Sequence, residues 1–217
     1  MLPFFYMALG ILVLLGFTAT IWRFSSLRLS IPCPTWLGWL VELDNPILRN
    51  NSARRIIQHL ALEPGMSVLD LGCGPGRLTL PVAAQVGPDG EVVAFDIQPG
   101  MLQRVRAKAQ AENLSNIQFI QGAAGEGKLG QSCYDRVLLV TVLGEIPDRQ
   151  AALAEILESL KPGGLLSVTE VIADPHFQRR DSVRGAAHAV GFVESACFGN
   201  RISFTMNFEK PPVASNG

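Results

Sequence analysis

The feature that most restricts the fold of this chain is a short apolar run that leads into a glycine-rich turn. Residues 68–76 read VLDLGCGPG, and a helical pattern of apolar residues follows at Arg77–Val86. Glycines at alternate positions let the backbone approach a ligand where a Cβ atom would collide, and they aim amide groups at it. A dinucleotide site spaces its glycines as G-x-G-x-x-G, and Arg77 stands where the third glycine would be. The turn therefore predicts a small-molecule site in an α/β domain and disfavours a nicotinamide-dependent oxidoreductase.

Strands and helices alternate along most of the chain. Apolar patterns predict strands at Ser67–Leu71, Glu91–Phe95, Ile117–Ile120, Arg136–Thr141, Leu165–Glu170, Phe192–Cys197 and Ile202–Phe208, and helices at Asn45–Leu62, Arg77–Val86, Gly100–Glu112, Arg149–Leu160 and Ser182–Val190. This alternation predicts a doubly wound α/β fold, with a largely parallel sheet and helices on both faces. The link Phe198–Arg201 is too short for a crossover helix, so the last strand should be antiparallel. Lys161–Gly164 (KPGG) is expected to form the turn before the fifth strand.

The N-terminal residues are more apolar than the rest of the chain. The whole chain is 48% hydrophobic, and residues 1–22 carry no charged side chain. A run of about 20 apolar residues is what a helix needs to cross a bilayer, so Leu2–Ile21 is predicted to be transmembrane. Arg23 and Arg28 follow the run, and the positive-inside rule then predicts that the body of the protein lies in the cytoplasm. We expect a single-pass membrane protein with an anchor at 1–22, an interfacial linker at 23–44, one domain at 45–210 and a tail at 211–217.

Charge and cysteine content argue against two classes of partner. The formal net charge is −1, whereas neutralising phosphates needs clustered lysine and arginine, so nucleic-acid binding is not expected. Cys33, Cys73, Cys133 and Cys197 are widely separated and show neither the spacing of a zinc site nor a dense disulfide framework. No metal is expected.

An acidic residue ends the second predicted strand. Asp96 follows the glycine turn at about the spacing where a dinucleotide-type fold places a carboxylate on ribose hydroxyls. The alternative is that Asp96 only starts the turn before Pro99.

Four segments in order resemble the motifs of a known family. DLGCGPG, AFDIQPGML, YDRVLLVTVLGEIPD and LKPGGLLSVTE resemble the class I S-adenosylmethionine-dependent methyltransferases, in the branch that includes ubiquinone and menaquinone biosynthesis enzymes. The resemblance covers about residues 45–210. It implies a Rossmann-like seven-stranded sheet of order 3-2-1-4-5-7-6, with S-adenosyl-L-methionine as cofactor and S-adenosyl-L-homocysteine as its product.

The resemblance also implies which residues bind the cofactor. Asp70 would hold the methionine amino group and Asp96 the ribose. The turn residues Gly72, Cys73, Gly74 and Gly76 would surround the methionine and ribose. The residues expected around the adenine and beneath the sulfonium are Ile97 and Met101 on the adenine face, Gln98 at the ribose or adenine edge, and Val140 and Thr141 at the tip of the fourth strand.

One position departs from the family pattern. After the third strand the family usually has an acidic residue that meets the adenine amino group, but this chain has Gln121–Gly125, with the sequence QGAAG. Binding of the adenine would then depend on backbone groups of Ala123 and Ala124, or on the nearby Glu126. A lost charge-assisted hydrogen bond costs about 1.5–3 kcal/mol, which the rest of the site could tolerate.

Candidates for methyl transfer follow the fourth and fifth strands, where ligands bind in open α/β sheets. Glu145 could orient the acceptor or cap the next helix, and His176 could remove a proton or be held in its loop by Asp174. A predicted membrane anchor favours a small lipid-like or quinone-like acceptor, because it concentrates the enzyme where such molecules dissolve. The alternative is a non-catalytic S-adenosylmethionine-binding module that recruits a partner at the membrane.

Overall fold

The computed structural model describes residues 51–212, together with Tyr6, Met7, Gly10, Val13, Phe17, Thr18 and Thr20. Its elements are α3 (Ala53–His59), β1 (Ser67–Leu71), α4 (Thr79–Val86), β2 (Glu91–Asp96), α5 (Pro99–Ala111), β3 (Ile117–Gln121), β4 (Tyr134–Val140), α6 (Arg149–Ser159), β5 (Leu160–Val171), α7 (Arg180–Ala189), β6 (Val193–Gly199) and β7 (Ser203–Glu209).

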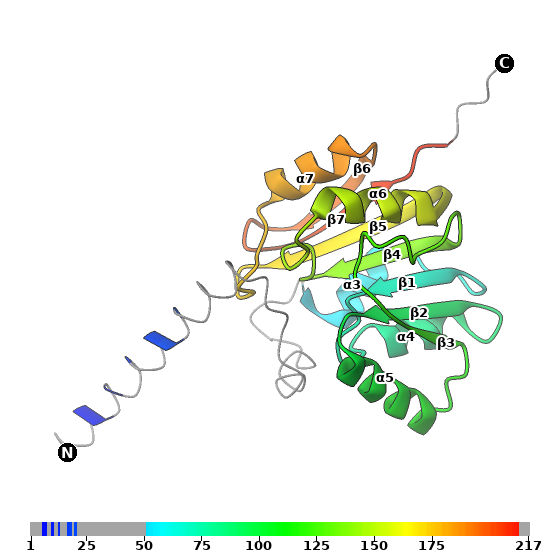
Figure 1. Cartoon of the computed structure of the whole chain (residues 1–217), viewed down its shortest axis with the longest axis horizontal. Coiled ribbons are helices and arrows are strands. Elements are labelled where there is room, and N and C mark those ends of the chain that lie inside the picture. Colours follow the sequence, from blue (N-terminus) through cyan, green and yellow to red (C-terminus); the bar gives the residue numbers. More distant parts are fainter. Residues whose placement is uncertain are drawn as a thin grey trace.

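The strands form one seven-stranded sheet in the order β3-β2-β1-β4-β5-β7-β6, which confirms the predicted order (Figure 1). Strands β3, β2, β1, β4 and β5 are parallel to one another, whereas β7 is antiparallel to both β5 and β6. Figure 1 shows them stacked from β3 at the bottom to β6 at the top.

Successive side chains of a strand point to opposite faces of the sheet, and the central strands are apolar at successive positions. Both faces of the sheet are therefore apolar. One core contains Leu69, Val93 and Leu139 from the strands, with the inner faces of α6 and α7. The other contains Val68 and Leu138, with the inner faces of α3, α4 and α5. The helices therefore form one layer on each face of the sheet, as predicted for a doubly wound fold.

Several predicted element boundaries differ from the observed ones by one to five residues, including the starts of β5 and α4 and the end of α3. Lys161–Gly164 was expected to be a turn, but it lies within β5, where the register with β4 shifts between Tyr134↔Leu160 and Arg136↔Leu165. The main chain of Lys210 holds this segment, donating to Gly164 O at 2.9 Å and accepting from Gly163 N at 3.1 Å. Helix α4 begins at Thr79 rather than at Arg77. The guanidinium of Arg77 instead donates to the carbonyl and side-chain oxygens of Asn51.

No helix among the described residues is long and apolar enough to cross a membrane. Most of the predicted span at Leu2–Ile21, the whole of the predicted linker at 23–44 and the end of the predicted tail, 213–217, lie outside the described residues.

Candidate active site

The candidate site lies where the parallel strands end. Strands β1 and β4 are neighbours, and the chain order of the strands reverses between them. In an open α/β sheet, ligands bind beyond the carboxyl ends of the strands at such a reversal. The loops after β1, β2, β4 and β5 are therefore the ones that can build a site.

The three glycines of the turn after β1 have positive φ angles, but only one opens onto free space. A Cβ atom at Gly72 (φ +75°) would lie 2.4 Å from Cγ2 of Val142, and one at Gly76 (φ +90°) would lie 3.1 Å from Cγ1 of Val105. A Cβ atom at Gly74 (φ +51°) would meet nothing within 4 Å. Gly72 and Gly76 thus serve loop packing, and the backbone at Gly74 is the part that a ligand can approach.

Asp96 ties the turn after β1 to the turn after β2. Its side chain is buried, and its two oxygens accept hydrogen bonds from the backbone of Gly74 at 2.9 Å and of Gln98 at 2.8 Å. Burial raises the pKa of the Asp96 carboxyl, while these backbone donors oppose the rise. Each carboxylate oxygen has two lone pairs, so an oxygen that already accepts one bond can accept another. Both oxygens of Asp96 therefore keep the capacity to accept from a hydroxyl, and the contact with a ribose stays a prediction.

Asp70 is held by a residue that the sequence reasoning missed. The Thr79 hydroxyl donates to Oδ2 of Asp70 at 2.6 Å, and both side chains are buried. Burial raises the pKa of Asp70 to about 6, and the Thr79 hydroxyl counteracts part of that effect. A hydroxyl in the first turn of the helix after the glycine turn was the only available signal.

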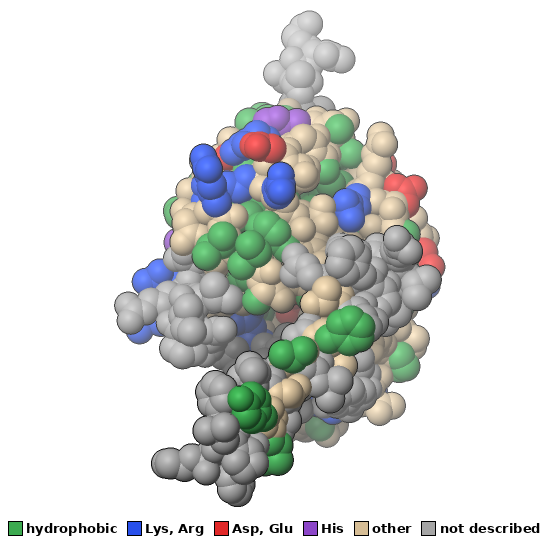
Figure 2. Space-filling model, turned by 90° about the vertical axis from the view of Figure 1, so that its left-hand side faces the viewer, with side chains coloured by type: hydrophobic (Ala, Val, Ile, Leu, Met, Phe, Trp, Pro, Cys, Tyr) green, Lys and Arg blue, Asp and Glu red, His purple; other side chains and the backbone are tan. Residues whose placement is uncertain are grey.

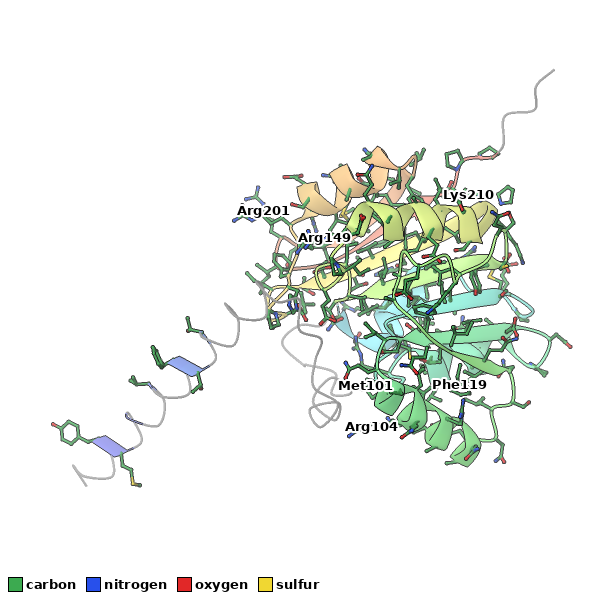
Figure 3. The ribbon with its side chains drawn as sticks, in the orientation of Figure 1. Met101, Arg104, Phe119, Arg149, Arg201 and Lys210 are labelled. Atoms are coloured by element: carbon green, nitrogen blue, oxygen red, sulfur yellow. The ribbon has the colours of Figure 1, made fainter. Side chains whose placement is uncertain are left out.

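The residues predicted around the adenine differ in how much surface they offer. Ile97 is 54% exposed, which suits packing on a ring, whereas Met101 on α5, labelled in Figure 3, is only 2% exposed and therefore buried. Contact between Met101 and a ligand would require the side chain to move. Gln98 is the N-cap of α5, and Cys73 is buried beside the turn, where burial raises the pKa of its thiol.

The loop after β3 binds its own carboxylate. Ala123 N–H donates to Oε2 of Glu126 at 3.3 Å, and Glu126 also pairs with Lys128 at 2.8 Å. Ala123 and Ala124 are half-buried. The backbone donor predicted for the adenine at Ala123 is therefore directed at Glu126 in this conformation.

The tip of β4 contains a backbone outlier. Thr141 has a φ of +57°, which a β-branched residue rarely adopts. Its N–H donates to Thr169 O at 2.8 Å, and its hydroxyl donates to Val140 O at 2.7 Å. Such strain is commonly found at functional sites, and here it lies at the strand end predicted to face the sulfonium.

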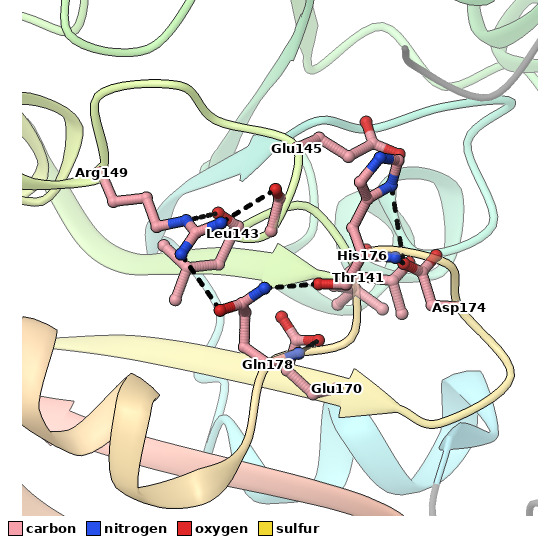
Figure 4. A network of polar contacts seen from close by, with 10 residues as sticks. Thr141, Leu143, Glu145, Arg149, Glu170, Asp174, His176 and Gln178 are labelled. Carbon is pink, nitrogen blue, oxygen red and sulfur yellow. Dashed lines mark hydrogen bonds and ion pairs between the residues drawn. The ribbon is translucent and has the colours of Figure 1, made fainter. Parts of the chain in front are cut away.

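The end of β5 and the loops after β4 and β5 bring together Glu145, Glu170, Asp174 and His176, here called the acidic loop cluster (Figure 4). Nδ1 of His176 lies 3.6 Å from Oε1 of Glu145 and 3.9 Å from Oδ1 of Asp174. His176 is buried, and its main-chain N–H donates to Oδ1 of Asp174 at 2.7 Å. Glu145 does not cap α6, because Asp148 is the N-cap and accepts from Ala151 N–H at 2.9 Å.

Two carboxyls of this cluster have pKa values well above the usual value for glutamate. Burial, followed by the charges of Asp174 and Asp96, raises the pKa of Glu145 to about 8. Burial also raises the pKa of Glu170 to about 8, against the hydrogen bond from Gln178 N–H at 3.0 Å. Like charges that raise one another's pKa form a site that a positively charged ligand stabilises.

Comparison with known proteins identifies the domain. A family model described as a methyltransferase domain matches residues 62–196. The chain belongs to this methyltransferase family. The family and its fold imply S-adenosylmethionine as the cofactor. Within the described residues of this methyltransferase domain, no group of three or more His, Cys, Asp or Glu side chains is arranged to hold a metal ion.

Curated relatives share part of their length with this methyltransferase. The demethylmenaquinone methyltransferase of Lactococcus lactis subsp. lactis is 39% identical over 100 residues, covering 46% of this chain and 40% of the relative. That of Staphylococcus carnosus is 35% identical over 112 residues, covering 52% and 46%. The arsenite methyltransferase of Halobacterium salinarum is 30% identical over 117 residues, covering 54% and 30%. The chain thus spans less than half the length of these relatives.

Solved structures agree with the fold. A SAM-dependent methyltransferase from Aquifex aeolicus superposes with a TM-score of 0.73 at 18% identity, covering 82% of this chain and 99% of that one. The [4+2]-cyclase SpnF superposes with a TM-score of 0.67 at 17% identity, covering 76% and 82%. At these identities the likeness shows the fold alone, and the chemistry has to be argued from the site.

The residues present fit S-adenosylmethionine. The open backbone at Gly74 leaves room for the ligand, and Asp96 beside it is oriented for hydroxyls. Asp70, Asp96, Glu145 and Asp174 are all acidic. Burial is the largest cause that raises the pKa values of Asp70 and Glu145, and repulsion from neighbouring carboxylates raises them further. The ligand carries a positive sulfonium and a positive amino group, so its binding relieves this repulsion.

Proposed function

We propose that this chain is an S-adenosylmethionine-dependent methyltransferase that acts on a small hydrophobic, quinone-like acceptor. The observation that carries the proposal is the hydrogen bond between Gly74 and Asp96, which joins an open glycine turn to a carboxylate oriented for ribose. The quinone-like acceptor is supported by the relatives named demethylmenaquinone methyltransferase.

The chemistry needs little from the protein beyond orientation and proton removal. The cofactor supplies an activated methyl group on a sulfonium leaving group. Asp96 would hold the ribose and Asp70 the amino group, and the protein would thereby orient the methyl donor. Glu145 and His176, 3.6 Å apart, receive the proton that an acceptor hydroxyl loses. The positive charge of the bound cofactor lowers the pKa of Glu145 and so favours its carboxylate form.

The proposed enzyme is anchored in the membrane by residues 1–22, with its domain in the cytoplasm. The described residues of this run are helical, and its large apolar side chains are exposed, with Tyr6, Val13 and Phe17 each 63–64% exposed. Extraction of membranes with alkaline carbonate should leave the full chain in the pellet. A reporter fused to the C-terminus should be resistant to protease added outside intact cells, and its digestion there would reverse the proposed orientation.

The surface of the domain supports this arrangement. Figure 2 views the side toward which β4 and β5 point, and its upper part shows apolar and basic side chains together with a few acidic side chains and a histidine. Ile172, directly after β5, and Ile202, directly before β7, are 43% and 46% exposed, and Ile172 N–H donates to Ile202 O at 2.8 Å. Arg201 lies at this same end, opposite Lys210 (Figure 3). Apolar side chains flanked by arginine suit the surface of an anionic bilayer.

A single assay tests the activity. Full-length protein in a non-ionic detergent is given radiolabelled S-adenosylmethionine and reduced demethylmenaquinone in mixed micelles, and the label in the organic phase is counted. Wild-type protein should transfer label, and Asp96→Ala should not, whereas the exposed control Glu158→Gln should match the wild type. Calorimetry with S-adenosylhomocysteine runs in parallel. Binding without transfer to any tested acceptor would instead support a non-catalytic cofactor-binding module, and absence of binding would refute both.

A further inference from the structure

One arginine behind the acidic loop cluster holds both of the loops that form it. Arg149 is the first residue of α6. Its guanidinium donates from Nε to Leu143 O at 3.0 Å and from Nη2 to Gly144 O at 3.2 Å, both in the loop after β4. Its Nη1 donates to Oε1 of Gln178, in the loop after β5, at 3.1 Å. In Figure 4, Arg149 lies at one end of this network and the His176 ring at the other.

Gln178 extends the connection to the residues of the cluster. Its side-chain amide donates to His176 O at 2.6 Å, and its main-chain N–H donates to Oε2 of Glu170 at 3.0 Å. The amide orientation is consistent at both ends, because its oxygen accepts from Arg149 and its nitrogen donates to His176. A chain of hydrogen bonds therefore runs from α6 to the backbone that carries the His176 ring.

The two loops are also in direct contact. A Cβ atom at Gly144 would lie 1.9 Å from His176 O and 2.7 Å from His176 Cβ, so a larger residue would push the loops apart. Leu143 beside it is buried in the core. The distance of 3.6 Å between Glu145 and His176 thus depends on how closely these loops approach each other.

We propose that Arg149 is a positioning residue that sets the approach of Glu145 to His176. It acts through the Leu143 and Gly144 carbonyls on one side and through Gln178 on the other. This inference rests on the proposed use of Glu145 and His176 as proton acceptors. It assigns Arg149 to the acceptor half of the site, and cofactor binding at Gly74 and Asp96 should be independent of it.

The geometric part of the proposal is tested without any acceptor. Hydrogen exchange of the full-length protein in detergent, followed by mass spectrometry, reports the opening of each segment. Arg149→Ala should raise exchange about tenfold or more in peptides covering 142–147 and 173–178, while β1, β2 and the turn 72–76 keep their protection. Arg184→Ala is the matched control, because Arg184 forms surface ion pairs with Asp181 and Glu194. Unchanged exchange in both loops would overturn the proposal.

The catalytic part is tested with a double-mutant cycle. With reduced demethylmenaquinone as the probe, Arg149→Ala should lower kcat/KM for the acceptor about 10- to 100-fold and change the Kd of S-adenosylhomocysteine less than about threefold. Arg149→Lys should recover part of the loss. When Glu145 has already been replaced by glutamine, adding Arg149→Ala should lower kcat/KM by a further factor of less than about three, because the two residues act as one unit.

Each other outcome counts against the positioning role. Additive losses in the cycle, or a parallel loss of cofactor affinity, would mean that Arg149 only supports the fold. If Arg149→Ala does not fold, Arg149→Lys and Gln178→Ala carry the same test. If the wild type methylates no quinone, the proposed function fails, and the exchange experiment still decides whether Arg149 holds the loops together.

Discussion

Replacing Glu170 with glutamine should make the protein more stable at neutral and alkaline pH. Glu170 lies at the end of β5 and is 1% exposed. Its Oε2 accepts from Gln178 N–H, but its Oε1 has no hydrogen-bond partner among the described residues. Burial raises the pKa of this carboxyl to about 8, so the folded protein keeps the proton at pH 7. Glutamine has the same shape, can accept from Gln178 and has no proton to lose.

The sign and size of the effect follow from linkage. The unfolded chain loses this proton near pH 4.5, whereas the folded chain loses it near pH 8. Stability contributed by the proton is therefore fully present below pH 4.5 and is lost as pH rises toward 8, at about 1.4 kcal/mol for each pH unit. The full interval gives an upper bound of about 5 kcal/mol. Water entering around the charged form would reduce this, so we expect a difference of about 2–4 kcal/mol between pH 5 and pH 9.

Urea unfolding of full-length protein at pH 5, 7 and 9 measures this difference. The free energy of unfolding of Glu170→Gln minus that of the wild type should grow with pH, and the m-values should be equal. Glu158→Gln, at an exposed position on α6, should follow the wild type at every pH. Parallel curves for the wild type and Glu170→Gln from pH 5 to pH 9 would refute the reasoning.

Three further predictions concern the cofactor and acceptor sites. Asp96→Ala should weaken S-adenosylhomocysteine binding in calorimetry by at least about tenfold, because it removes a charged acceptor, and Asp96→Asn should lose less. Gly72→Ala should lower the free energy of unfolding by about 2–4 kcal/mol because of its positive φ and its contact with Val142, whereas Gly74→Ala should unfold closer to the wild type and mainly lose cofactor affinity; equal losses of stability would contradict the distinction. Glu145→Gln should lower kcat by more than about tenfold and remove an ionisation from the pH–rate profile that the wild type shows at or below about pH 8.

The alternation of strands and helices and the glycine turn between β1 and α4 were predictable because their signals are local, whereas the strand order was predicted from the resemblance to a known family. A strand, a glycine turn and a helix occupy one continuous segment, and right-handed crossovers then restrict how successive strands are arranged. The short link before β7 predicted its antiparallel direction for the same reason. The prediction of a turn at Lys161–Gly164 was wrong because this segment pairs with Lys210, which lies far away in the sequence. The residues near the segment give no sign of that pairing.

The contacts that the side chains of the site make could not be predicted from local sequence patterns. Helical spacing is compatible with Met101 facing a ligand or the interior, and only the packing of α5 on the sheet decides that it is buried. The bond from Thr79 to Asp70 depends on how α4 returns beside β1. The contacts of Arg149 with Gln178 join loops that follow different strands.

By itself the sequence determined the alternation of strands and helices, the glycine-rich turn after β1 and the acidic residues at the strand ends. Glycine content and apolar periodicity are properties of neighbouring residues, so they can be recognised in the sequence. Only the tertiary structure decided which glycine faces open space and how close Glu145 comes to His176. Those distances are set by contacts between segments that meet only after the sheet has formed, and contacts of that kind leave no local pattern in the chain.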